Sequence, residues 1–167
     1  MLKVLSALAA SVSFASVCLG QTSLSGPIQI GNTGRYVQAF YSQGDFNQAL
    51  NTIATIPPLR IGGRVLYPKM AEPSSFLINQ TIKNAYGERL QGFWIGGTRP
   101  RSPTWPGNWT WVNTGAPFTF TDWGTGQPSN TAYREDRLNY WSTRGRMSWN
   151  DISSSFIAPG FVVIYAP

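Results

Sequence analysis

Two polar stretches in the second half of the chain carry oxygen atoms suited to holding a metal ion. The first, Gly126–Asp136, contains amide, hydroxyl and carboxylate side chains, and the second is Trp149-Asn150-Asp151. Oxygen ligands without sulfur or imidazole favour calcium over zinc or copper. Pro128 stands between Gln127 and Ser129, and a cis bond before it would turn both side chains the same way. From chemistry alone, the alternative is an ordinary solvated loop.

The composition excludes several kinds of chemistry. The 167 residues include no histidine and a single cysteine, Cys18. This excludes Ser-His and Cys-His catalysis, histidine metal ligands, cysteine-only zinc sites and internal disulfides. Glu135 and Asp136 are adjacent, so in an extended segment their side chains point apart and do not form a pair for glycoside hydrolysis. We therefore expect a binding protein and not an enzyme.

The strands that would position these polar residues are short and lie mostly late in the chain. Arg35–Tyr41 and Phe161–Tyr165 have strand composition, and we expect them to pair and to bring the termini together. Arg60–Tyr67 contains a Gly62-Gly63 turn. Further short strands are expected at residues 93–97, 109–111, 118–120, 140–141 and 147–149. With two helices between the first and the later strands, the order predicts an α+β fold with an antiparallel sheet.

The two helices are predicted from apolar spacing and end signals. Asp45–Ile56 has an apolar residue at every third or fourth position, and Asp45 can cap its first turn. Pro57-Pro58 ends that helix. A second helix is expected from near Glu72 to Tyr86, with Phe76 and Leu77 facing the core.

The first 20 residues have the layout of a secretory signal peptide, with Lys3 before an uncharged apolar run and Gly20 before the expected cut. A cut after Ala15, a membrane anchor and a lipoprotein site at Cys18 are the alternatives. The signal predicts a secreted protein without a membrane span after processing. We divide the chain into a signal (1–20), a short segment (21–29) and one domain (30–167). The net charge of +6 comes from scattered basic residues, so it predicts a solvated surface and no nucleic-acid partner.

The motifs between Phe93 and Tyr165 resemble, in order and spacing, those of C-type lectin domains. The matching segments are Phe93–Gly97, Trp109–Val112, Phe120–Trp123, Gly126–Ser129, Glu135-Asp136 and Trp149–Asp151. The two expected helices also match, so the resemblance covers roughly residues 30–167. It implies a C-type lectin-like fold in which two helices pack on antiparallel sheets and a long loop binds ligand.

In that family the long loop holds a calcium ion that ligates two sugar hydroxyls. The resemblance implies calcium ligands, which also contact the sugar, at Gln127, Ser129, Glu135, Asn150 and Asp151. Tyr133 is the candidate to stack on a galactose-like ring. The implied partner is a carbohydrate or glycoconjugate, with a protein ligand as the alternative.

The sequence departs from the family pattern in two ways. The disulfide cysteines are missing, and Arg137, Ser154 and roughly Val163 stand at their positions, so packing must compensate for the lost bridges. The loop motif is Gln-Pro-Ser, which leaves two formal charges, Glu135 and Asp151, and weakens the expected calcium affinity. An amide in first place favours galactose-type over mannose-type sugars. A metal-free module that binds protein or ice is the rival hypothesis.

Other conspicuous residues have structural interpretations. Trp94, Trp111 and Trp149 are expected in the core, and Trp105 on the surface. Asn79 and Asn108 begin N-glycosylation sequons, which matter only in a eukaryotic secretory pathway.

Overall fold

The computed structural model describes residues 21–100 and 108–167. The predicted signal peptide, residues 1–20, and Trp105 lie outside the described residues. No helix within the described ranges has the length and apolar character needed to cross a bilayer.

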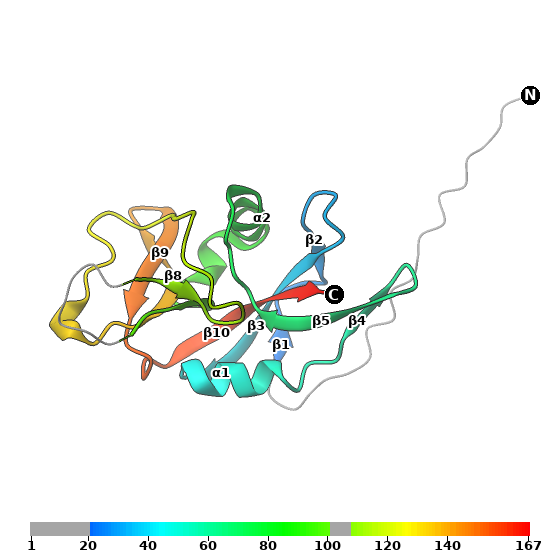
Figure 1. Cartoon of the computed structure of the whole chain (residues 1–167), viewed down its shortest axis with the longest axis horizontal. Helices are drawn as coiled ribbons and strands as arrows, with labels where there is room; N and C mark the ends of the chain where they lie inside the picture. The colour runs from blue at the N-terminus through cyan, green and yellow to red at the C-terminus, as the bar shows by residue number, and fades with distance from the viewer. Residues whose placement is uncertain (1–20, 101–107) are drawn as a thin grey trace, which may run out of the picture.

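One continuous sheet organises the described part of the chain (Figure 1). Its main path runs, in spatial order, through β1 (Thr22–Ser23), β3 (Tyr36–Gly44), β10 (Ala158–Ala166), β6 (Trp94–Thr98), β8 (Arg137–Thr143) and β9 (Arg146–Ile152). The predicted pairing of the first and last long strands is confirmed, since β3 and β10 are antiparallel neighbours with Phe40 opposite Phe161. The sheet is mixed, because β10 and β6 pair in parallel where Phe161 meets Trp94.

Shorter strands complete the sheet, and β2 (Ile28–Gln29) pairs with β3. The predicted glycine turn is confirmed, because Gly62-Gly63 joins β4 (Leu59–Ile61) to β5 (Arg64–Met70), and β5 then pairs with β10. β7 (Thr110–Trp111) pairs with β6. The strand expected at residues 118–120 is wrong. The backbone makes only a bridge at Pro117, while the rings of Phe118 and Phe120 pack on the core.

The first helix, α1 (Phe46–Ile53), begins where the sequence predicts it but ends three residues before Ile56 and is capped by Ala54, ahead of Pro57-Pro58. The Asp45 side chain accepts a hydrogen bond from Gln48 N, and the Gln48 side chain accepts one from Asp45 N. This reciprocal cap satisfies two backbone donors that the helix leaves free. Phe46, Ala49 and Ile53 form its buried face.

The second helix, α2 (Phe76–Tyr86), begins later than expected because Ser75 caps it, accepting a hydrogen bond from Ile78 N. Phe76 and Leu77 were expected in the core, but they are 66% and 48% exposed. The residues that face the core are Ile78, Asn79, Ile82 and Tyr86. Ile78, Ile82 and Tyr86 lie on one face at intervals of four, and because this face packs on the core, Phe76 and Leu77 point outward.

Two groups of buried apolar side chains hold the sheet between the helices. Ile78, Ile82 and Tyr86 of α2 belong to one group, and α1 packs in the other. The predicted core positions of Trp94, Trp111 and Trp149 are confirmed, since each is at most 2% exposed. Trp149 is surrounded edge-on by the rings of Trp111, Phe118, Phe120 and Trp123. These rings pack the long loop between β7 and β8 onto the sheet.

Candidate functional site

Three of the five predicted ligand residues, Ser129, Glu135 and Asp151, are joined by hydrogen bonds where the long loop meets β9, and Gln127 and Asn150 are close to them along the chain. Gln127 and Ser129 lie in the loop between β7 and β8, and Glu135 stands two residues before β8. Asn150 and Asp151 belong to β9, where Asp151 pairs with Leu138 of β8. This register brings the end of the loop beside the second polar stretch.

Asp151 ties the loop to the sheet. Its two carboxylate oxygens accept hydrogen bonds from the backbone N–H groups of Ser129 and Asn130, each at 2.7 Å. Asp151 is fully buried. Burial raises the pKa of its carboxyl group above the ordinary value, the two backbone hydrogen bonds oppose this, and the negative charge of Glu135 adds to the rise. A cation in this position would relieve both the burial and the repulsion.

Glu135 lies within reach of the same loop segment. Its Oε2 accepts hydrogen bonds from Thr131 N at 2.6 Å and from the Ser129 hydroxyl at 2.7 Å. The Ser129 hydroxyl thus donates to one carboxylate while its backbone N–H donates to the other. A hydroxyl that donates its hydrogen keeps two lone pairs, so Ser129 Oγ can still ligate a cation.

Gln127 supplies the clearest sign of a missing partner. The Gln127–Pro128 peptide bond is cis. Gln127 Oε1 is buried and accepts no hydrogen bond from the described residues. The side-chain oxygen and nitrogen of Asn130 are also buried without a hydrogen-bond partner among those residues. Buried polar atoms in folded proteins nearly always have a partner. Asn130 had not been singled out from the sequence, where nothing distinguishes it from other loop asparagines.

Asn150 completes the set. Both hydrogen bonds that the structure gives its side chain use the amide nitrogen, which donates to Asn139 Oδ1 at 3.1 Å and to Asp151 O at 2.8 Å. The amide oxygen therefore remains for another partner. Two carboxylates, a hydroxyl and two amide oxygens fit a calcium ion, which takes hard oxygen ligands. Within the described ranges, no three acidic, histidine or cysteine side chains cluster, so any metal ion at this loop would need neutral oxygens for most of its ligands.

Tyr133 lies at the outer rim of the loop. It is 60% exposed, and its backbone N–H donates to Asn130 O. Its side chain is therefore accessible, two residues before Glu135 in the chain.

A buried hydrogen-bond network lies beneath the site, and the sequence analysis missed it. Asn79 of α2 accepts hydrogen bonds from the Tyr140 hydroxyl at 2.8 Å and from Trp149 Nε1 at 3.0 Å. Its amide nitrogen donates to Asp122 Oδ2 at 2.9 Å. Asn79 thus links α2 to Trp149 of β9, which is next to Asn150, and to Asp122 in the loop that leads to Gln127. The one sequence feature that could have indicated this network is an asparagine on the apolar face of a predicted helix.

Asp122 is the charged end of this network. Lys83 Nζ lies 2.6 Å from Oδ2, and Arg146 Nη2 lies 3.0 Å from Oδ1. Burial alone would raise the pKa of Asp122, but the hydrogen bonds from Lys83 and Asn79 and the Lys83 charge hold it below the ordinary value. Two backbone hydrogen bonds also attach this part of the loop to β9, since Trp149 N donates to Asp122 O and Gly124 N donates to Trp149 O.

The two N-glycosylation sequons differ in whether their asparagine is accessible to a glycan. Asn79 is fully buried with both polar atoms bonded, which excludes a glycan on it in the folded protein. Asn108 is exposed.

The base of the loop is closed without a disulfide. Asp136 lies between Arg137 and Ser154, which stand at two of the missing cysteine positions. Its Oδ1 accepts a hydrogen bond from Ser154 N at 2.9 Å, and its Oδ2 lies 3.3 Å from Arg137 Nη1. One carboxylate therefore joins the two segments that a bridge would join, in addition to the aromatic packing expected from the sequence.

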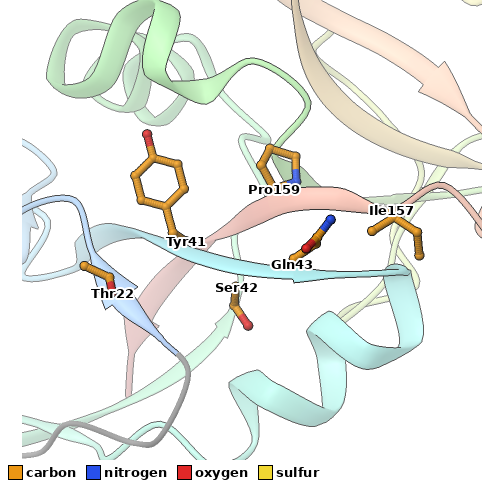
Figure 2. A pocket seen from close by; sticks show the side chains of 6 residues that line it. All are labelled: Thr22, Tyr41, Ser42, Gln43, Ile157 and Pro159. Atoms are coloured by element: carbon orange, nitrogen blue, oxygen red, sulfur yellow. The ribbon is translucent and has the colours of Figure 1, made fainter.

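A surface depression of about 410 Å³ lies outside the loop, lined by residues of β1, β3 and the start of β10 (Figure 2). Figure 2 shows Tyr41 and Ser42 pointing to opposite sides of β3. Since its polar groups do not converge, and none of the predicted site residues lines it, the loop remains the candidate site.

Comparison with known proteins agrees with this architecture, although no protein-family model matches the chain. A perlucin-like protein of Mytilus galloprovincialis is 28% identical over 102 residues, 61% of this chain and 61% of that protein. A hepatic lectin of Gallus gallus is 36% identical over 69 residues, 41% of this chain and 30% of that protein. The matches thus span less than two thirds of either relative.

Solved structures show the fold directly. The C-type lectin CEL-I from Cucumaria echinata superposes with a TM-score of 0.60 at 19% identity, covering 79% of this chain and 90% of that one. With its two helices and mixed sheet, the chain has the C-type lectin-like fold that its motifs predict.

Proposed function

We propose that this domain binds carbohydrate at the long loop through one calcium ion held by Gln127, Ser129, Glu135, Asn150 and Asp151. The observation that carries the proposal is the buried amide oxygen of Gln127, which has no hydrogen-bond partner among the described residues. The lectin names of the relatives support the ligand class. The signal-like residues 1–20 support a secreted protein.

A bound calcium ion supplies positive charge and coordination positions that sugar hydroxyls can fill. The residues of this chain then select the sugar. If Gln127 Oε1 faces the ion, its Nε2 can donate to a sugar hydroxyl, and the Ser129 hydroxyl can donate or accept. Tyr133, at 60% exposure, can pack its ring against the apolar face of a galactose-type sugar. The proposed preference is therefore galactose over mannose.

Thermal melting in calcium and in chelator tests the metal. With a dissociation constant of about 1 mM, 10 mM calcium would stabilise the fold by about 1.4 kcal/mol and raise the melting temperature by roughly 4 °C. Asp151→Ala should abolish the shift, and Glu88→Ala removes an exposed carboxylate from another part of the surface as a matched control. The same melting temperature in both buffers for the unmutated chain would overturn the calcium site.

Gln127→Met provides a variant that does not disturb the fold. Since Gln127 Oε1 accepts no hydrogen bond in the described structure, its removal should leave the melting temperature in chelator unchanged while reducing the calcium shift. Equal shifts in the variant and the unmutated chain would show that Gln127 is not a ligand.

A glycan array with and without chelator tests the sugar. The unmutated chain should bind galactose-type glycans only in calcium, and Gln127→Glu with Ser129→Asn should move the preference toward mannose. Preferential mannose binding by the unmutated chain would refute the role of the amide order.

The second candidate is metal-free binding of protein or ice at the same loop. It is favoured by the hydrogen bonds that already satisfy both carboxylates, since Asp151 and Glu135 each accept two from the loop itself. This candidate predicts no calcium shift in melting.

A further inference from the structure

The register of the sheet gathers basic side chains that are far apart in the sequence. Val65, Tyr67 and Lys69 alternate with Leu66 and Met70 along β5, and the latter two are buried. Successive side chains of a strand point to opposite faces, so Tyr67 and Lys69 share the outer face. Arg60 of β4 pairs directly with Val65 and therefore lies on that face too.

The resulting row is exposed and has an aromatic ring at its centre. Arg60 and Lys69 are exposed, and Tyr67 is 53% exposed. The row from the Arg60–Val65 pair to Lys69 spans four residues of β5, roughly 13 Å at about 3.4 Å per residue. Two cations, Arg60 of β4 and Lys69 of β5, thus flank the tyrosine on one face of the hairpin.

Two more cations lie at this end of the sheet. Tyr36, Tyr165 and Pro68 are successive partners across β3, β10 and β5, which places Arg35 beside the same strand ends. Arg64 approaches that segment, with its Nη1 3.5 Å from Gly34 O. We call Arg35, Arg60, Lys69 and Tyr67 the hairpin surface, and leave Arg64 out of it because its side chain alternates with that of Val65 and so lies on the other face of β5.

Within residues 21–100 and 108–167, no acidic side chain forms an ion pair with the hairpin surface. Asp45 is the single acidic residue between Arg35 and Lys69. It caps α1 after the far end of β3, roughly 30 Å along the strand. Glu72 is turned toward Asn113 and Thr114. In the described parts of the chain, neither Arg64 nor the three cations of the hairpin surface form an ion pair with an acidic side chain.

The hairpin surface is separate from the candidate calcium site. Figure 1 shows the β4–β5 hairpin projecting from one end of the molecule, while the loop before β8 lies at the other end. A ligand at the hairpin therefore needs none of the predicted calcium ligands.

We propose that the hairpin surface binds a sulfated polysaccharide independently of calcium. Guanidinium and ammonium groups at intervals along an open strand match a linear chain with repeated anionic groups, and the arginines can bind each sulfate through two hydrogen bonds. The Tyr67 ring packs against the apolar face of a sugar between two charges. The site is an extended open row and not an enclosed pocket, which favours a polymer over a small anion.

Heparin is the probe for the test, with binding to the full chain measured in chelator over a range of salt concentrations. Arg60→Gln with Lys69→Gln should weaken binding at least about tenfold at 0.05 M salt. It should also reduce the slope of log affinity on log salt by about two, or one per cation removed. Tyr67→Ala should weaken binding without changing that slope. Arg64 is kept, because its contact with Gly34 serves the fold.

Arg134→Gln with Arg144→Gln is the matched control, since it removes the same charge from two exposed arginines elsewhere. An equal loss in both double variants would show that net charge alone drives binding and would overturn the proposal. Binding that requires calcium, or no heparin binding at all, would overturn it as well. Tighter binding of a DNA duplex than of heparin would show that the partner class is wrong. Melting curves confirm that each variant is folded.

Discussion

Replacing Asn79 by alanine should destabilise the whole domain, because one side chain supports three buried connections. The substitution removes the acceptor for the Tyr140 hydroxyl and for Trp149 Nε1, both on fully buried residues. It also removes the donor to Asp122, which keeps Lys83 and Arg146 as partners.

The size of the expected destabilisation follows from the two buried donors, the Tyr140 hydroxyl and Trp149 Nε1, that would lose their acceptor. Leaving a buried donor without a partner costs about 1–3 kcal/mol. Neighbouring losses do not add fully, so we expect a decrease of roughly 3–5 kcal/mol in the free energy of unfolding. In a domain of this size that corresponds to a fall of about 10 °C in melting temperature.

Urea unfolding of the full chain in chelator measures the effect. Gln80→Ala is the control, since Gln80 is the next residue of α2 and its side chain makes no hydrogen bond within the described structure. A loss below about 1 kcal/mol, or one equal to that of Gln80→Ala, would refute the role assigned to the network.

Three further outcomes are expected. The pKa of Asp122 in the folded protein lies below its ordinary value of 3.8, so the ionised side chain stabilises the fold above that pH, and this stabilisation is lost as the pH falls through the lower pKa. Asp122→Asn should therefore make the stability measured by urea unfolding fall less steeply with pH below about pH 4. Gly160→Ala should prevent normal folding, seen as lost near-ultraviolet circular dichroism, since a Cβ there would collide with Phe40 O. Tyr133→Ala should weaken galactose binding by about threefold to tenfold in calorimetry while leaving the calcium shift in melting unchanged.

Local signals account for what the sequence predicts correctly. The Asp45 cap and the apolar spacing of residues 46–53 act within one helix, so they can be interpreted without knowing the rest of the fold. The glycine pair at 62–63 likewise specifies a hairpin turn. The ligand motifs of the loop were found by resemblance, and β8–β9 pairing brings them together.

Long-range pairing explains what the sequence does not predict. Phe76 and Leu77 have core composition, but the face of α2 that packs on the core is the one that carries Ile78, Ile82 and Tyr86. Asn79 resembles a glycosylation site in the sequence, and only the approach of Asp122, 43 residues later, shows its role. The basic residues of the hairpin surface look scattered because sheet register, not sequence distance, makes them neighbours.

Direct calorimetric titration of calcium into chelator-treated protein tests the central claim, that the loop holds one calcium ion. We expect one saturable site per chain with a dissociation constant of about 1 mM. Its affinity should be weakened in Gln127→Met, and the site should be absent in Asp151→Ala. A titration without saturable heat, or one that is unchanged in both variants, would contradict it.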